Sequence, residues 1–168
     1  MYHCPVHICL VGVADGFASV AEAAKPRPSF SHRFRRLEAP DTAAMAEADA
    51  LFVDVTGHDA LAWIREALEA KKPRACIVVV AAREQIDELA PLLDRIHDIW
   101  VAPLSARELS YRFERWLDRC KRDADAWRDN QYLEATIHSI PSLVWYKSKD
   151  GIHHKVNDAF CATVNKAK

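Results

Sequence analysis

The sequence has no apolar stretch approaching the roughly 20 residues of a membrane-spanning helix, and its N-terminus lacks a signal-peptide pattern. It also has no long basic run, and its formal net charge is −1. These absences predict neither a membrane segment nor a nucleic-acid-binding surface. The five cysteines are scattered and odd in number, which predicts reduced thiols in a cytoplasmic protein.

Half of the 168 residues are hydrophobic and 28% are charged, which is typical of a globular protein. A chain of this length accommodates one full domain, with a buried core, and a further fragment. No glycine pattern of a nucleotide-binding loop and no GxSxG motif occurs. The "GVADG" segment at 12–16 is only a weak match to a phosphate loop.

Short apolar runs and helical patterns alternate along the first 120 residues. The runs "VHICLV" and "ACIVVVAA" are rich in β-branched residues, as expected for buried strands. Strand–helix alternation at short spacing implies parallel pairing through right-handed crossovers. We therefore predict that residues 1–120 form a doubly wound five-stranded α/β domain. Its expected strands are 6–11, 34–39, 50–55, 75–82 and 98–104, and its expected helices are 17–25, 41–48, 58–72 and 83–96.

A long helix is expected over 105–140, where neither glycine nor proline interrupts the pattern. Ser105 and Glu108 fit a capping box at its start. At 1.5 Å per residue this helix would span roughly 50 Å, which is longer than the domain is wide. Its apolar seam therefore predicts a partner helix and a homodimer. The expected interface residues are Phe113, Trp116, Cys120 and Trp127.

The tryptophans are expected to divide between core and surface. Trp63, Trp100 and Trp116 lie on predicted apolar faces and are expected in the core, although Trp116 also belongs to the seam. Trp127 lies beyond the domain and is the better interface candidate.

A second module is predicted after Pro141. Residues 143–156 pattern as a hairpin with Asp150-Gly151 in its turn, and Asn157 is a candidate cap for a following helix. We expect the segment 141–168 to be the N-terminal fragment of a second domain, because it is too short to close a sheet and a core.

The stretch "LEATIHSIPSLVWYKSKDGIHHKVNDAFCATVNK" resembles the opening of a PAS domain. This resemblance implies a bacterial sensor protein in which the PAS domain precedes an output domain, such as a diguanylate cyclase or a histidine kinase. It implies that the partners of the α/β domain include the chain's own PAS and output domains. It implies no cofactor.

The first 120 residues resemble a response-regulator receiver domain, which is flavodoxin-like, in strand order and landmark spacing. Asp54 ends the third predicted strand, where that family carries its phosphoacceptor, and Pro103 ends the fifth. Where the family has two metal-binding acids, a hydroxyl residue and a lysine, this chain departs from it. The residues at these places are Gly12 and Val13, Val80 to Ala82, and Ala102. Asp15 comes two or three residues late.

The resemblance implies that Mg²⁺ would bind only if Asp54 is phosphorylated, and Asp15 and Asp54 are the candidate ligands. A hard cation draws its affinity from several oxygen ligands, and phosphoryl transfer to a carboxylate needs charge neutralisation. We therefore expect Asp54 to be vestigial, with a structural role such as accepting backbone N–H bonds in the following loop.

Three functions remain open from the sequence. The favoured one is a non-enzymatic interaction module that passes a signal through the long helix to the PAS domain. The second is a phosphorylation-competent receiver whose metal site is rebuilt from Asp15, Asp54 and a backbone carbonyl. The third is an enzyme that uses His58 and Asp59 beside Asp54, although polar residues at a helix start are more often caps.

Overall fold

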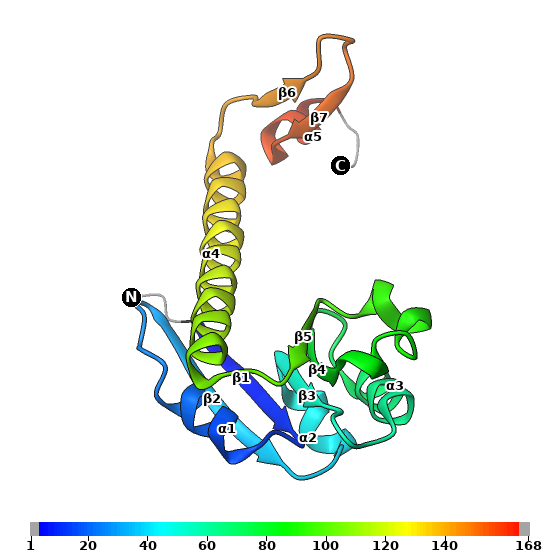
Figure 1. Cartoon of the computed structure of the whole chain (residues 1–168). Coiled ribbons are helices and arrows are strands. Elements are labelled where there is room, and N and C mark those ends of the chain that lie inside the picture. The colour runs from blue at the N-terminus through cyan, green and yellow to red at the C-terminus, as the bar shows by residue number, and fades with distance from the viewer. Residues whose placement is uncertain (1–3, 165–168) are drawn as a thin grey trace. The chain divides into compact units, whose positions relative to one another are not determined.

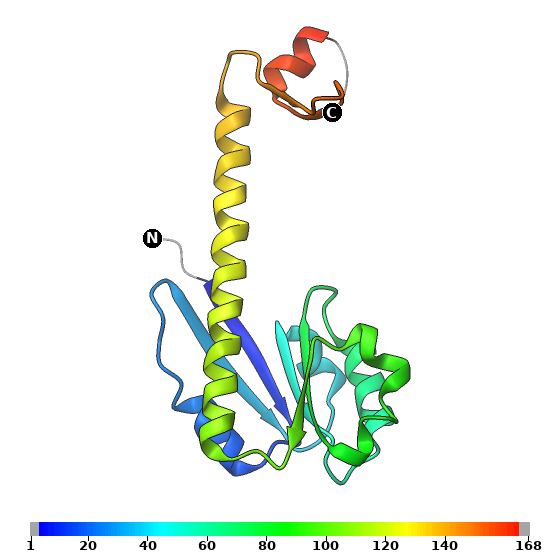
Figure 2. The same cartoon turned by 45° about the horizontal axis from the view of Figure 1, so that its top comes forward.

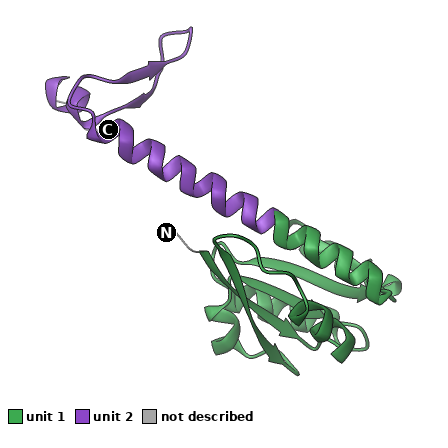
Figure 3. Ribbon diagram, turned by 90° about the vertical axis from the view of Figure 1, so that its left-hand side faces the viewer, with its two compact units in different colours: residues 1–118 green, residues 119–168 purple. Residues whose placement is uncertain are grey.

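The computed structural model describes residues 4–164, and the chain divides into two compact units. The first unit is Met1–Asp118 and the second is Arg119–Lys168 (Figure 3). The predicted boundary at residue 120 lies two residues further on. Residues 1–3 of the predicted α/β domain and residues 165–168 of the predicted fragment lie outside the described residues.

The first unit contains a five-stranded parallel sheet in the order β2-β1-β3-β4-β5 (Figure 1). This confirms the predicted doubly wound α/β architecture. The second strand differs in extent from the predicted 34–39, because it begins four residues earlier. The strands are β1 (Cys4–Val11), β2 (Phe30–Leu37), β3 (Ala50–Asp54), β4 (Cys76–Ala82) and β5 (Asp98–Ala102).

Three short helices connect the strands, and side chains cap two of them. They are α1 (Asp15–Glu22), α2 (Thr42–Glu47) and α3 (Ala60–Ala70). The Asp41 carboxylate accepts a hydrogen bond from the Ala44 amide at 3.0 Å, and that of Asp59 accepts one from the Ala62 amide at 2.9 Å. Each satisfies an amide of a first helical turn that has no partner within the helix.

The predicted α-helix over 83–96 is wrong. Two 3₁₀ segments stand in its place, η1 (Arg83–Gln85) and η2 (Ala90–Arg95). Pro91 has no amide hydrogen to donate, and its ring would clash with a carbonyl one turn earlier in an α-helix. The apolar pattern is nevertheless used, because Leu89 and Leu92 are buried.

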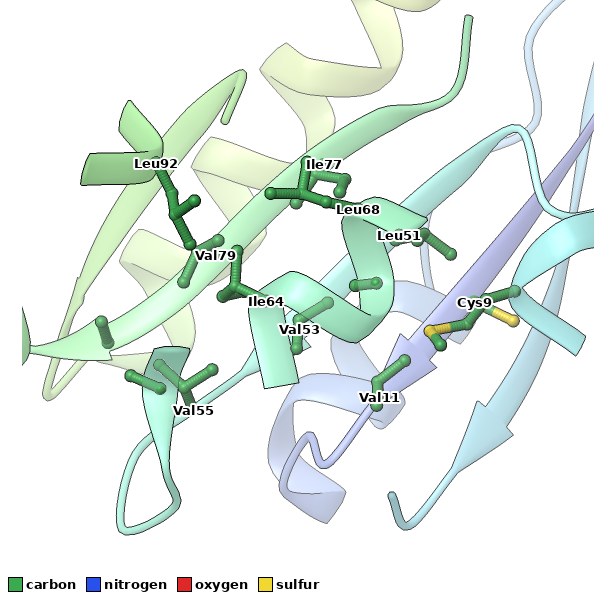
Figure 4. Close-up of a cluster of buried hydrophobic side chains, with 14 of the residues drawn as sticks. Cys9, Val11, Leu51, Val53, Val55, Ile64, Leu68, Ile77, Val79 and Leu92 are labelled. Carbon is green, nitrogen blue, oxygen red and sulfur yellow. The ribbon is translucent and has the colours of Figure 1, made fainter. Parts of the chain in front are cut away.

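Aliphatic side chains fill the side of the sheet covered by α2 and α3 (Figure 4). Ile64 and Leu68 of α3 pack on side chains of the central strands, and their spacing of four residues places them on one face of the helix. The strand residues of this cluster include Val11, Leu51, Val53, Ile77 and Val79. Trp63 packs against the cluster and is half-buried.

Aromatic side chains fill the other side of the sheet. Phe52 of β3 lies at the centre, with ring centroids 4.8 Å from Trp116 and 5.3 Å from Trp100. Phe17 of α1 and Phe113 complete the cluster. Phe113 is fully buried and Trp116 is only 6% exposed. Their assignment to a dimer interface is therefore corrected, because both side chains pack inside the first unit.

The helix that carries Phe113 and Trp116 is α4 (Ala106–Ser139), which begins in the first unit and continues into the second. The predicted cap is present, since the Ser105 hydroxyl accepts a hydrogen bond from the Glu108 amide at 3.2 Å. Arg27 binds the first part of this helix. Its guanidinium, with a side chain only 10% exposed, contacts Glu114 at 2.6 Å and Asp118 at 2.8 Å.

The second unit contains the end of α4, an antiparallel pair of strands and a short helix. The strands β6 (Trp145–Lys147) and β7 (His153–Val156) form the predicted hairpin, and α5 (Asp158–Val164) follows. Asn157 is buried, and its Oδ1 accepts hydrogen bonds from the Phe160 amide at 3.1 Å and the Val144 amide at 3.0 Å. This confirms Asn157 as the cap of α5.

Among residues 4–164, none of the helices combines the length and the apolar character needed to cross a membrane. The elements of the second unit can also be followed in the rotated view (Figure 2).

Candidate functional site

The carboxyl ends of the parallel strands surround a hollow of about 250 Å³. Asp54, the last residue of β3, is part of the wall. Within the part of the chain that the structure describes, Asp54 is the one charged residue of the lining. The other lining residues are apolar or glycine: Ala14, Gly16, Phe17, Val80, Ala102, Leu104, Ala106 and Leu109.

Asp54 has a structural role in the loop that follows β3. Its Oδ1 accepts a hydrogen bond from the Thr56 amide at 2.9 Å. This confirms the predicted bond to a backbone amide of the loop. No further hydrogen bond or ion pair of the carboxylate occurs within residues 4–164, so its second oxygen is without a partner among these residues.

Asp15, the second candidate metal ligand, is engaged elsewhere. It is the first residue of α1, and its carboxylate pairs with Arg36 at 2.5 Å. The Asp15 side chain is 88% exposed and does not line the hollow. No group of three or more His, Cys, Asp or Glu side chains in the described residues is arranged to hold a metal ion. A Mg²⁺ ion at Asp54 would therefore depend on one carboxylate, water and backbone oxygens.

Gly12 stands where the resembled family has its first acid, and no side chain fits there. Its φ of +68° lies in the left-handed region, which favours glycine. A Cβ atom would lie 2.6 Å from the Trp63 ring and 2.9 Å from the Asp54 carbonyl oxygen. The Trp63 ring in turn stacks on His58, with centroids 4.0 Å apart. This packing excludes an acidic side chain at position 12.

Apolar residues also occupy the remaining places around Asp54. Val80 of β4 is the register partner of Asp54, and Ala102 ends β5. Both line the hollow, and neither supplies a hydroxyl group or a positive charge. The place of a phosphoryl-binding group is therefore taken by apolar surface.

Gln85 is a residue of this region that the sequence did not single out. Its Oε1 accepts a hydrogen bond from the Ala82 amide at 3.0 Å, and its Nε2 donates to the Val55 carbonyl at 2.8 Å. A weaker contact reaches the His58 carbonyl at 3.2 Å. Gln85 thus joins the end of β4 to the loop after Asp54. The sequence shows only that Gln85 is a polar residue three positions after a buried strand. This pattern is too common to predict its hydrogen bonds.

The His58–Asp59–Asp54 set proposed for an enzyme does not assemble. Asp59 caps α3, and the exposed His58 ring stacks on Trp63. Neither residue belongs to the lining of the hollow. The polar residues of this turn therefore serve the start of α3 and the loop, as expected for a helix N-terminus.

No protein-family model and no curated protein matches the chain. Solved structures that it resembles include the ChxR receiver domain from Chlamydia trachomatis, at 18% identity over 68% of this chain and 99% of that chain, with a TM-score of 0.44. The pilus assembly protein CpaE from Caulobacter crescentus is 15% identical over 68% of this chain and 96% of that chain, with a TM-score of 0.47.

A chain from the complex of the CheA3 P1 domain with CheY6 from R. sphaeroides is 18% identical, over 73% of this chain and 98% of that chain, with a TM-score of 0.45. With TM-scores below 0.5, these likenesses carry no argument about function.

Proposed function

We propose that this chain is a regulatory and interaction domain of a bacterial multidomain signal-transduction protein, receiver-like in fold and not switched by phosphorylation. The observation that carries the proposal is the surroundings of Asp54. Its carboxylate lies at the strand tip where a receiver is phosphorylated, but the described residues around it are apolar. This combination supports a receiver-like module in which Asp54 is not phosphorylated, because the lining of the hollow supplies neither a hydroxyl group nor a positive charge within the described residues.

The energetics support a vestigial Asp54. Attack of a carboxylate on a phosphoryl donor brings two anions together, so the reaction depends on a metal ion and fixed positive charges. The hollow supplies one carboxylate, and Ala102 replaces the lysine. If each lost group costs about 2–4 kcal/mol of transition-state stabilisation, the rate falls by several orders of magnitude.

In this proposal, helix α4 transmits the signal from the first unit to the second. The chain forms a homodimer through the same helix. Because Phe113 and Trp116 are buried in the first unit, the proposed dimer interface consists of Cys120 and Trp127. Trp127 is 51% exposed. The two residues are seven positions apart, which places them within about 20° of each other around a helix. An exposed tryptophan on a helical seam favours a partner helix.

Sedimentation velocity of the chain over a range of concentrations tests this function. We expect a dimer that Trp127→Glu dissociates, because the substitution places a charge in an apolar seam. Tyr111→Glu is the matched control: Tyr111 is 66% exposed on the same helix, about 160° around it from Trp127, and its replacement should leave the dimer intact. A monomer at all concentrations would contradict the proposal.

The C-terminal module is proposed to be the start of a PAS domain that connects to an output domain. The contacts of Asn157 support mechanical coupling, because its Nδ2 donates to the Ile140 carbonyl at 3.0 Å and the Ser142 carbonyl at 2.8 Å. One side chain thereby joins the segment after α4 to the start of α5. A displacement of the helix end would be transmitted to the hairpin.

Two alternatives follow from the same hollow. A phosphorylation-competent receiver would use Asp54 with Mg²⁺, which requires Asp15 to leave Arg36 and reach the hollow. An enzymatic α/β domain would need several polar groups converging on the cavity, and Asp54 alone does so among the described lining residues. We therefore propose a non-enzymatic module, which acts in the cytoplasm without a cofactor.

A further inference from the structure

We propose that the hollow at Asp54 is a binding site for a small organic cation: an ammonium group on an aromatic or aliphatic body of about ten non-hydrogen atoms. This inference goes beyond the proposed function, because such binding would occur whether or not the chain transmits a signal. It rests on the size, the lining and the charge of the cavity.

The volume of the hollow limits the number of non-hydrogen atoms in the ligand. A dry apolar cavity of about 150 Å³ accommodates benzene, which has six heavy atoms. By the same proportion, the hollow of about 250 Å³ holds about ten. It is too large for a single metal ion with one protein ligand and too small for a nucleotide.

The lining sets the body of the ligand. Phe17, Val80 and Leu109 are buried side chains that provide an apolar floor. Ala14, Gly16 and Ala106 are exposed and provide the mouth through which a ligand enters. Burial of a hydrocarbon body against these residues removes apolar surface from water, which favours binding.

The charge sets the head group. The Asp54 carboxylate is half-buried and keeps one oxygen without a hydrogen bond among the described residues. No positively charged side chain lines the hollow within residues 4–164. An anion would therefore meet repulsion, whereas an ammonium group would donate a charge-assisted hydrogen bond.

The positive end of α4 does not reverse this preference. Ala106, the first residue of that helix, lines the mouth of the hollow. The Ser105 hydroxyl already accepts from the Glu108 amide, and the Glu108 carboxylate adds a negative charge in the first turn. Both offset the partial positive charge of the helix terminus. The full charge of Asp54 decides the polarity of the site.

The test uses three probes that share a phenylethyl group and differ in charge: 2-phenylethylammonium, 2-phenylethanol and 3-phenylpropionate. Each is titrated into the ¹⁵N-labelled full chain, and amide shifts are followed by NMR. We expect saturable shifts around Gly16, Thr56 and Ala102, with the ammonium bound about tenfold more tightly than the alcohol and the propionate bound most weakly. Added salt should lower the binding affinity of the ammonium probe but not that of the other two probes.

Variants assign the effect to the cavity. Asp54→Asn keeps an oxygen for the Thr56 amide and should reduce ammonium affinity to that of the alcohol. Asp94→Asn, an exposed aspartate outside the lining, is the matched control and should bind as the wild type does. Ala102→Leu should fill the hollow and abolish binding of all probes.

Absence of saturable shifts with every probe would overturn this inference, as would propionate binding as tight as ammonium binding. An Asp54→Asn variant with unchanged ammonium affinity would also overturn it. No phosphoryl donor is present in the titrations. Failure to bind is therefore distinguishable from failure of the proposed function, which the oligomeric state and the phosphorylation of Asp54 decide.

Discussion

At the scale of single residues, Gly12 and Trp63 explain why Asp54 has no acidic neighbour. The Trp63 ring occupies the space that a side chain at position 12 would need, and the backbone there has a positive φ. The packing of α3 against β1 therefore leaves no room for a side chain at position 12. A substitution of Gly12 by aspartate would clash with Trp63 and with the Asp54 carbonyl oxygen.

Gly12→Ala should destabilise the fold by about 2–4 kcal/mol, through left-handed backbone strain and overpacking against Trp63. Urea denaturation measures the change. Gly16→Ala is the matched control, because a Cβ atom there meets no atom within 4 Å and its φ is not positive. It should be neutral or stabilising by up to about 1 kcal/mol, since alanine favours the helix. Equal stability of the two variants would refute this account of Gly12.

Two histidines of the first unit predict a pH dependence of stability. The His97 Nδ1 accepts a hydrogen bond from the Ile77 amide at 3.1 Å. Burial lowers the pKa of His97 below its ordinary value of 6.5, and Lys71 lowers it further. Burial, and then Arg27, lower the pKa of His32, against an opposing effect of Glu114.

The unfolded chain therefore binds more protons than the folded chain once the pH falls below 6.5. The free energy of unfolding should fall as the pH drops through 6.5, and it should level off below the folded pKa values. His97→Asn, whose amide oxygen can accept from Ile77, should reduce this fall. Denaturant titrations at several pH values test it, and an equal fall in the variant would contradict the role of His97.

At the scale of elements, Asn157 holds the second unit together. Its side chain satisfies two amides, those of Val144 and Phe160, and donates to the carbonyls of Ile140 and Ser142. A buried amide that makes these bonds at once cannot be replaced by a carboxylate, because the carboxylate would face the same carbonyl oxygens.

Asn157→Asp should cost the second unit about 3 kcal/mol of local stability, so that the Val144 and Phe160 amides exchange roughly a hundredfold faster. Hydrogen exchange followed by NMR measures both amides. Asn130→Asp makes the same chemical change at an exposed position of α4 and should leave the two rates unaltered. Undiminished protection in Asn157→Asp would show that other contacts hold the unit.

The sequence predicted the features that depend on local patterns. Apolar runs located the strands, Asp54 fell at the tip of β3, and Ser105 and Asn157 were predicted as caps because a cap requires a side-chain oxygen at one position. The prediction of an α-helix over 83–96 was wrong, because the apolar spacing there is helical but Pro91 interrupts an α-helix.

Tertiary contacts explain the other failures. Phe113 and Trp116 lie on the same helical stripe as Trp127, and only the packing of α4 on Phe52 shows which part of the stripe is covered. The Gln85 bonds and the Trp63 contact with Gly12 join segments far apart in the sequence. No local periodicity reports such contacts.

At the scale of the whole molecule, the chain combines a unit built on a five-stranded parallel sheet with a second unit that shares helix α4. In the proposed account the first unit no longer performs phosphoryl chemistry. Its remaining roles are to dock, to dimerise through α4 and to pass a signal to the module that follows. The central claim is that Asp54 is not phosphorylated.

The most direct test is intact-mass spectrometry of the chain after incubation with acetyl phosphate and Mg²⁺, with Asp54→Asn treated in parallel. The account predicts no added phosphoryl group on either protein at any Mg²⁺ concentration. A mass increase of one phosphoryl group on the wild type that is absent from Asp54→Asn would contradict it, and would make the hollow an active phosphorylation site.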